Sequence, residues 1–147
     1  MKEIVAYPGC FVCGLKSQIG LKARFFWDGK KAFCDITADE EYAGYKGILH
    51  GGIVATLLDE VMIKALLAEE LLVVTAEITV RFKKPVYSGD RLHLEGWKIG
   101  EKEAVYFTKG QAINHNGITV AKATGRYVKS TNGLSDKLRE SLKYDDL

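Results

Sequence analysis

Hydrophobic and polar residues alternate with a period of two along much of the chain, a pattern that indicates half-buried β-strands. The first such segment spans 21–38 and contains an Asp-Gly pair at 28–29, which is typical of a tight hairpin turn. Four more alternating segments follow, at 76–85, 90–99, 104–113 and 118–129. Turns are expected at 100–102 and at the Asn-Gly pair 116–117. The pattern predicts a hairpin followed, later in the chain, by a four-stranded antiparallel meander.

One segment between these strands has helical rather than alternating character. From Ile53 to about Leu72, apolar residues cover most of the circumference of a helix, and good helix formers dominate. A helix that is apolar on most sides belongs inside a core. One such helix and about six antiparallel strands pack most economically as a sheet curled around the helix, an α+β fold. The open edges of that sheet favour the pairing of two copies, so we expect a homodimer.

Length and composition restrict the class of protein further. A chain of 147 residues predicts one domain, which we assign to 1–130, with a tail at 131–147 that contains a short helix near 135–142. The 47% hydrophobic and 27% charged residues exclude a disordered or disulfide-dense chain. A net charge of +2 without a long basic run gives no argument for nucleic-acid binding, and no apolar stretch reaches membrane-spanning length. The N-terminus does not resemble a signal peptide, so we expect a reducing, cytoplasmic location.

Asp59 is the first candidate for chemistry, because it is a carboxylate in the middle of the predicted buried helix. Its neighbour Glu60 has Lys64 four residues later, the favourable order for a helical ion pair, but no cation lies one turn from Asp59. Removing a carboxylate from water costs several kcal/mol unless something compensates. Asp59 therefore either lies in a wet cleft where its reactivity is used, or points to solvent along a stripe with Thr56, Glu60 and Lys64.

The start of the same helix, His50-Gly51-Gly52, is the second candidate. Two glycines allow close backbone approach and leave amide N–H groups uncovered, and the partial positive charge of a helix N-terminus suits an anion or a polarised carbonyl oxygen. Gly51 and Asp59 lie ~12–14 Å apart along one helix, so a single chain does not bring them together. Antiparallel helices of two copies would do so. The alternative is an ordinary turn at the helix entry.

At this point the sequence resembles a known family. Residues 49–60, LHGGIVATLLDE, resemble the helix signature of hotdog-fold acyl-CoA thioesterases of the phenylacetate-pathway type. Residues 75–86 resemble the strand that follows it there, 88–90 are similar to the next turn, and CFVCG at 10–14 is similar to an N-terminal motif of some hotdog subfamilies. The resemblance implies a hotdog fold and hydrolysis of an acyl-CoA thioester at a dimer interface. We also expect two dimers to pair into a homotetramer.

The resemblance also implies a role for individual residues. Asp59 would act as the nucleophile or as the general base for water, and the Gly51 amide would polarise the thioester carbonyl. His50 would assist at the helix end, and Thr75 stands where the family often has a hydroxyl that orients water. Some relatives place an asparagine where this chain has Gly44, so a further carbonyl contact is in question here.

The phosphates of CoA require cations near the mouth of a site. The candidates are Arg81, Lys83, Lys84 and Arg126, and further Arg91 and Lys129. The alternative for the strand cations is a solvated face. Gly52 and Glu60 complete the expected substrate-binding set, and no cofactor is expected. Candidate residues for an acyl tunnel are Tyr7, Phe11, Tyr42 and Tyr45.

Two other kinds of chemistry are weakly supported. Cys10 and Cys13 have the spacing of a zinc knuckle, with Cys34 and His50 as conceivable further ligands, but there is no second Cys-x-x-Cys pair, so we expect no metal site. The absence of a Gly-x-Ser-x-Gly elbow gives no support for a serine hydrolase. The leading hypothesis is an acyl-CoA thioesterase. The alternative is a non-catalytic acyl-CoA-binding or regulatory hotdog protein, and the signature of a hotdog dehydratase is not seen.

Overall fold

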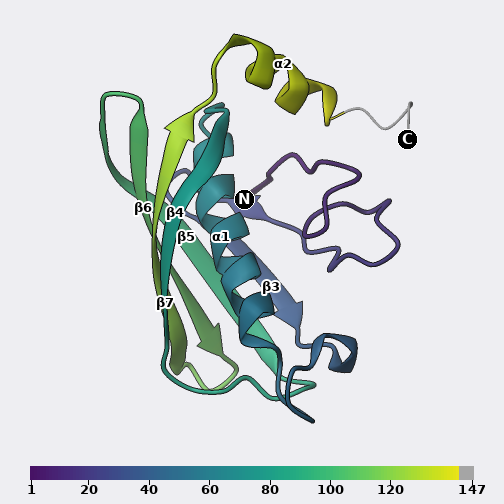
Figure 1. Ribbon diagram of the computed structural model, residues 1–147. Helices are drawn as coiled ribbons and strands as arrows, with labels where there is room; N and C mark the ends of the chain where they lie inside the picture. Colours follow the sequence, from purple (N-terminus) through teal and green to yellow (C-terminus); the bar gives the residue numbers. More distant parts are fainter. Residues whose placement is uncertain (143–147) are drawn as a thin grey trace.

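The computed structural model describes residues 1–142, in which an antiparallel sheet curves around one long helix, α1 (Gly51–Leu67), as Figure 1 shows. The strands are β1 (Lys2–Glu3), β2 (Phe26–Trp27), β3 (Ala32–Thr37), β4 (Val73–Phe82), β5 (Arg91–Lys102), β6 (Val105–Asn114) and β7 (Thr119–Lys129). Their order across the sheet is β1-β2-β3-β5-β6-β7-β4. A short 3₁₀ helix, η1 (Glu40–Tyr42), precedes α1, and α2 (Asn132–Glu140) follows β7. The predicted α+β class, with a sheet wrapped around a central helix, is confirmed.

The core lies between α1 and the concave face of the sheet. Leu58, Val61 and Met62 are fully buried there. The helix approaches β5 so closely that a Cβ at Gly96 would lie 2.5 Å from the Val61 carbonyl oxygen. Only glycine fits at that crossing, and the missing side chain lets α1 settle into the sheet.

The helix ends at Leu67, five residues before the predicted end at Leu72. Glu70 adopts a positive φ of 62°, and the Leu71 amide donates to the Leu66 carbonyl, which closes the last turn. The apolar residues that follow belong to the start of β4, where Val73 is buried. Apolar residues shared between a helix end and a strand start do not show where one gives way to the other.

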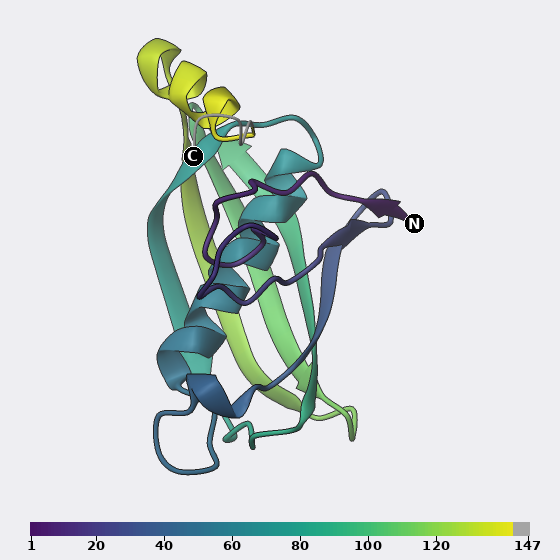
Figure 2. The same ribbon diagram turned by 90° about the vertical axis from the view of Figure 1, so that its right-hand side faces the viewer.

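Two further expectations about strands are corrected. The first arm of the N-terminal hairpin is only β2, because residues 21–25 hydrogen-bond to the N-terminal segment, for example through the Ala23 amide and the Val12 carbonyl. In Figure 2 this N-terminal segment crosses in front of α1. Residues 100–102 are part of β5 rather than a turn, since the chain reverses after them, where Glu103 has a φ of 58°. The turn at 116–117 is confirmed.

β4 lies at one end of the sheet and pairs only with β7. Within residues 1–142 no strand covers its other edge. α2 confirms the predicted helix in the tail, although 143–147 of that tail lie outside the described residues. No helix in the described part of the chain is long and apolar enough to cross a membrane.

Candidate active site

The Asp59 carboxylate is held in place by two hydroxyl groups from neighbouring strands of the sheet. Its Oδ1 accepts hydrogen bonds from the Thr75 hydroxyl on β4, at 3.0 Å, and from the Tyr127 hydroxyl on β7, at 2.9 Å. Within residues 1–142 no cation forms an ion pair with Asp59, and no hydrogen bond reaches its second oxygen, Oδ2. One oxygen is therefore fixed, and the other is free to meet a reactant.

Tyr127 is the residue at this site that the sequence analysis missed. It is fully buried, and its hydroxyl also lies 3.2 Å from the Asp59 main-chain carbonyl. Burial and the negative charge of Asp59 raise the pKa of the Tyr127 phenol, so the group stays protonated and donates. A sequence signal was present in Gly125, two positions earlier on the same face, where a Cβ would lie 2.6 Å from the Tyr127 ring.

The N-terminus of α1 presents a different arrangement. His50 caps the helix, and its Nδ1 accepts a hydrogen bond from the Gly52 amide at 2.8 Å. A neutral His50 that accepts at Nδ1 carries its proton on Nε2, which leaves that atom as a donor. The Gly51 amide donates to no acceptor in the described part of the chain. A Cβ at Gly44 would lie 3.1 Å from the His50 ring, so the small residue at 44 gives the imidazole its space.

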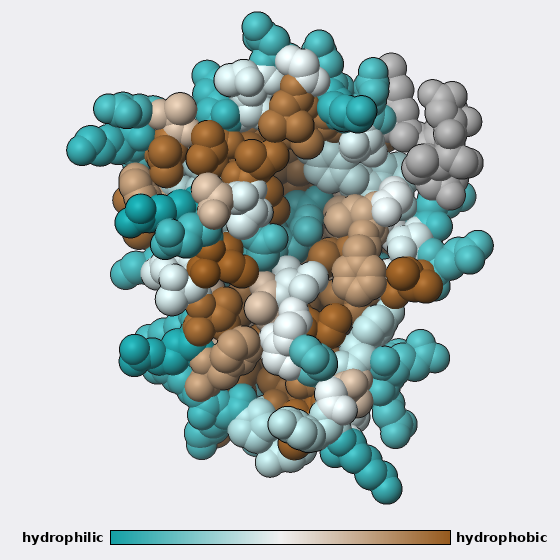
Figure 3. All heavy atoms as spheres, viewed as in Figure 1, coloured by the Kyte–Doolittle hydropathy of each residue, from teal (hydrophilic) through white to brown (hydrophobic). Residues whose placement is uncertain are grey.

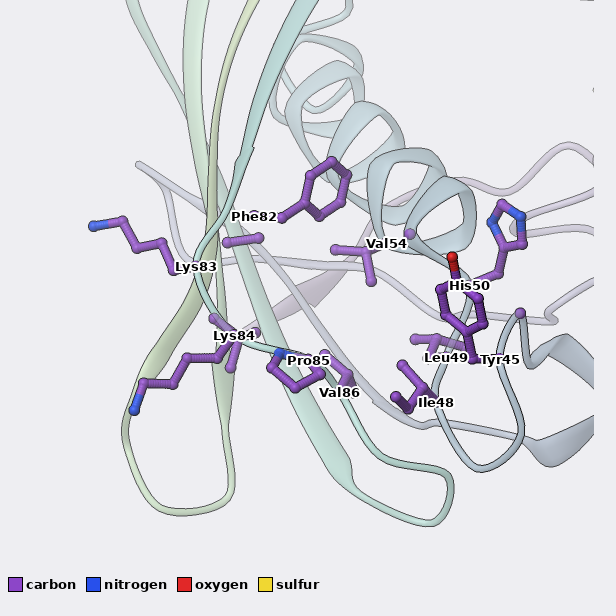
Figure 4. A pocket seen from close by; sticks show the side chains of 14 residues that line it. Tyr45, Ile48, Leu49, His50, Val54, Phe82, Lys83, Lys84, Pro85 and Val86 are labelled. Carbon is purple, nitrogen blue, oxygen red and sulfur yellow. The ribbon is translucent and has the colours of Figure 1, made fainter.

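A pocket of about 730 Å³ opens at this helix end. Its lining includes His50, Gly51, Val54 and Phe82, together with Tyr45. Figure 4 shows Phe82 and Val54 between β4 and the first turn of the helix, while the side chains of Lys83 and Lys84 extend outward. The pocket is therefore apolar inside, with hydrogen-bond donors at the helix start and cations at its rim.

A second pocket, of about 820 Å³, lies between α1, α2 and the N-terminal segment. Asp59 and Glu60 line it together with apolar side chains, among them Ile63 and Leu67. The face seen in Figure 3 is hollowed, with hydrophobic residues around a hydrophilic floor. Asp59 and Gly51 thus line separate pockets of one chain, about 12 Å apart along α1.

Glu60 and Lys64 form the ion pair that their spacing predicted, with 4.0 Å between Oε1 and Nζ. The pair is buried, because the Lys64 side chain is only 1% exposed, so the alternative of a solvated stripe is wrong for this residue. The Lys64 ammonium donates to the Val5 carbonyl at 2.6 Å. Burial, together with the Cys10 sulfur nearby, raises the pKa of Glu60 to about 7, although Lys64 acts in the opposite direction.

The four cations proposed for CoA are only partly brought together. Lys83 and Lys84 line the pocket at the helix start. Arg81 is exposed on β4 and lines neither of the two large pockets. The Arg126 guanidinium lies over the Phe107 ring at 5.5 Å, away from both of these pockets.

The aromatic candidates for an acyl tunnel also separate. Tyr45 lines the pocket at the helix start, and Tyr7 lines the pocket of Asp59. Tyr42 donates through its hydroxyl to the Ile19 and Gly20 carbonyls. Neither of the two pockets formed by residues 1–142 brings all of these residues together.

Comparison with known proteins agrees with this architecture. Residues 46–106, which include α1 and β4, match the family model of the thioesterase superfamily. Two curated proteins, acyl-coenzyme A thioesterase 13 from Homo sapiens and its counterpart from Pongo abelii, are each 27% identical to this chain over 100 residues, which cover 67% of it. The match spans 66% of those curated relatives, just under two thirds of their length.

Several solved structures share the fold of this chain. The Escherichia coli PaaI protein from the phenylacetic acid degradation operon has a TM-score of 0.70 at 21% identity, covering 74% of this chain and 84% of its own. A hypothetical thioesterase from Streptococcus pneumoniae, solved with coenzyme A, has a TM-score of 0.66 at 20% identity, covering 70% and 80%. Two further structures of the Streptococcus pneumoniae protein carry an aspartate-to-alanine and a threonine-to-alanine substitution. The hotdog fold implied by the sequence resemblance is confirmed.

Proposed function

We propose that the protein is an acyl-CoA thioesterase that converts an acyl-CoA to a free acid and CoA, with its site at the interface of a homodimer. The observation that carries the proposal is the Asp59 carboxylate, which is fixed through one oxygen by Thr75 and Tyr127 and has no cationic partner within residues 1–142. A carboxylate oxygen that no cation occupies is available to accept a proton from a reactant. The match of residues 46–106 to the family model of the thioesterase superfamily and the likeness to acyl-coenzyme A thioesterase 13 support this proposal.

The chemistry follows from the two ends of the site. The thioester carbonyl oxygen accepts a hydrogen bond from the Gly51 amide, where the helix N-terminus favours the developing negative charge. Asp59 either removes a proton from the attacking water or attacks the carbonyl carbon itself through Oδ2. The C–S bond then breaks, and CoA leaves as a thiolate that takes up a proton. A thioester has a good leaving group, so this arrangement needs no serine triad.

A second copy of the chain would join the two ends. Gly51 and Asp59 lie about 12 Å apart on one α1, so a shared site requires the helices of two chains to run antiparallel. The uncovered edge of β4 supports such pairing, because two copies of this edge can extend the sheet across a twofold axis. Phe82, at the end of β4, is 54% exposed and lies beside Gly51. Pairing of two dimers into a homotetramer stays a prediction, which sedimentation analysis tests.

Two features support binding of the CoA part. Lys83 and Lys84 extend at the rim of the pocket that contains Gly51, where they can meet phosphates. The structural neighbour from Streptococcus pneumoniae was solved with coenzyme A. In the two alanine variants of that neighbour, the threonine follows the aspartate by 16 residues, the interval that separates Thr75 from Asp59 here.

The test is turnover of a panel of CoA esters, followed through the released thiol. We expect Asp59→Asn to lower kcat by about 100- to 10,000-fold, the usual contribution of a general base. Asp136→Asn is the matched control, since Asp136 is exposed on α2 and pairs only with Arg139 among the described residues. Wild-type protein that binds CoA esters tightly without turnover would instead establish the non-catalytic alternative.

Single-turnover hydrolysis in oxygen-18 water separates the two roles of Asp59. Direct attack by the carboxylate forms an anhydride with the acyl group, and water that opens this anhydride at the Asp59 carbonyl carbon leaves label in the peptide that contains Asp59. General-base catalysis leaves that peptide unlabelled and places the label in the product acid alone. Mass spectrometry of the digested protein reads out the difference.

A further inference from the structure

The N-terminal segment brings two cysteines onto the middle of α1. The sulfur atoms of Cys10 and Cys13 and a carboxylate oxygen of Glu60 all lie within 4.8 Å of one another. The Cys10 thiol donates to Glu60 Oε2 at 4.0 Å. Cys34 and His50, the two further ligands that the sequence suggested, lie outside this cluster, on β3 and at the start of α1. The third group of the cluster is Glu60 instead. The cluster does not enter the proposed hydrolysis.

The loop that carries the cysteines is shaped to present their sulfur atoms. The Val12 amide donates to Cys10 Sγ at 3.3 Å, and the Gly14 amide donates to the Cys10 carbonyl at 2.9 Å. A Cβ at Gly14 would lie 2.4 Å from the carbonyl oxygens of Cys10 and Pro8, so the tight turn requires glycine there. A backbone amide that donates to sulfur stabilises a thiolate, which is the form that binds metal.

The charges around the cluster fit a divalent cation. A dication bound by two thiolates and one carboxylate has a net charge of −1. The Lys64 ammonium, 4.0 Å from Glu60 and 1% exposed, offsets that charge. Its other close partners are the Val5 carbonyl and the rings of Tyr7 and Phe25, which are all groups that attract a cation. A buried charge is stable only when it is paired, and the metal-bound cluster is electrically neutral as a whole.

We propose that Cys10, Cys13 and Glu60 form a binding site for one thiolate-preferring divalent cation of the Zn²⁺ class. Zinc binds sulfur at about 2.3 Å and carboxylate oxygen at about 2.0–2.2 Å in a tetrahedron. Its donor atoms therefore lie closer to one another than the three atoms of this cluster do, and a small adjustment of the side chains brings them into place. Three protein ligands leave the fourth position open. Cys10 and Glu60 line the pocket of about 820 Å³, through which an ion and a water molecule can enter.

The test uses the full chain, reduced and stripped of metal, and titrates it with Zn²⁺ and with Co²⁺ as a spectroscopic substitute. We expect one ion per chain, a thiolate-to-cobalt charge-transfer band and the ligand-field spectrum of a tetrahedral site. Cys10→Ser and Cys13→Ser should each weaken binding and reduce the charge-transfer band. Cys34→Ser is the matched control and should retain both, because that thiol lies outside the cluster.

Glu60→Gln distinguishes a site with three ligands from binding by the two thiols alone. It preserves the size of the side chain, so it also serves as the test if a cysteine variant fails to fold. We expect its Zn²⁺ affinity to fall by at least about 10- to 100-fold, the cost of losing even an outer-shell partner. Glu60→Gln binding as tightly as wild type, or no Zn²⁺ uptake by the reduced wild type, overturns the proposal. Asp59→Asn should lose turnover and keep the metal, so failure of this proposal is distinguishable from failure of the proposed hydrolysis.

Discussion

The two polar regions of α1, its start at Gly51 and the position of Asp59, differ in exposure and in charge. At its start the helix is exposed, and Gly51 leaves an amide without a partner in the described chain, so a positive partial charge is available without the cost of burial. Two turns later the helix packs against the sheet, and the half-buried Asp59 is held at the wall of a pocket because Thr75 and Tyr127 donate to it. The comparison shows that one helix carries a hydrogen-bond donor and a carboxylate that line separate pockets, and the proposed dimer would bring them together.

The largest effect that separates the two regions is expected from Gly51→Pro, which removes the amide hydrogen. Proline is tolerated at the first position of a helix, and His50, with φ −58° and ψ 131°, already has the extended conformation that precedes proline. We expect kcat to fall by about 100- to 1,000-fold, the usual cost of losing one oxyanion donor. Gly51→Ala keeps the amide, and its Cβ would lie at 3.6 Å from Phe82, an ordinary contact. Equal activity of the two variants would contradict the role of the amide.

Mixing two inactive variants tests whether the regions belong to one shared site. A heterodimer of Asp59→Asn and Gly51→Pro chains contains one site with both defects and one with neither. Random pairing makes half of the dimers mixed, so the mixture should regain about a quarter of wild-type activity after subunit exchange. No recovery, with mixed dimers demonstrated by mass spectrometry, would mean that each chain supplies a complete site.

A smaller effect is expected from Tyr127→Phe, which removes one of the two donors to Asp59 and leaves the buried ring in place. A hydrogen bond to a charged group contributes about 1.5–3 kcal/mol, which corresponds to about a 10- to 100-fold fall in kcat when the reaction depends on it. Steady-state kinetics on the best ester of the panel measures the change. Tyr106→Phe, a substitution of the same kind on β6, should leave kcat close to wild type.

The smallest effect concerns the helix start alone. His50→Ala removes the acceptor of the Gly52 amide, and loss of such a cap costs about 0.5–2 kcal/mol of unfolding free energy. His50→Asn offers an oxygen in place of Nδ1 and should recover most of this loss. Urea unfolding of the three proteins measures the difference, and equal stability would show that the cap contributes nothing.

The local sequence predicted most elements of this molecule, but the predicted four-stranded meander is wrong, because β4 pairs with β7 and only β5, β6 and β7 follow one another in the sheet. The Asn-Gly pair at 116–117 specified its hairpin because its residues accept the required backbone conformation, and the continuous apolar run identified α1 as a core helix. The helix end was not readable, because Leu71 and Leu72 suit either a helix or a strand. The turn at Glu103 was missed as well, since a charged residue with positive φ has no strong sequence signal.

The candidate site also contains one part that the sequence predicted and another that it did not. Asp59 was identified by its missing counter-ion within one turn, which is a property of local sequence. Tyr127 lies 68 residues further along; the register between β4 and β7 places it opposite Thr75, and the packing of α1 on the sheet brings the carboxylate to both hydroxyls. The meeting of Cys10 with Glu60 joins positions 50 residues apart, and it depends on a loop that hydrogen-bonds to residues 21–23. Contacts between distant segments are set by packing, and local sequence patterns do not predict them.

The hydrogen bond from Lys64 to the Val5 carbonyl has a practical consequence for anyone who edits the beginning of this protein. That carbonyl is the main-chain acceptor of the Lys64 ammonium. Removal of the first five residues would therefore leave this buried group without its main-chain hydrogen bond. Shortened versions should therefore melt at lower temperature than versions that carry an extension ahead of Met1. The first residues of the chain therefore belong to the folded structure, and they are best kept in protein prepared for crystallisation or enzymology.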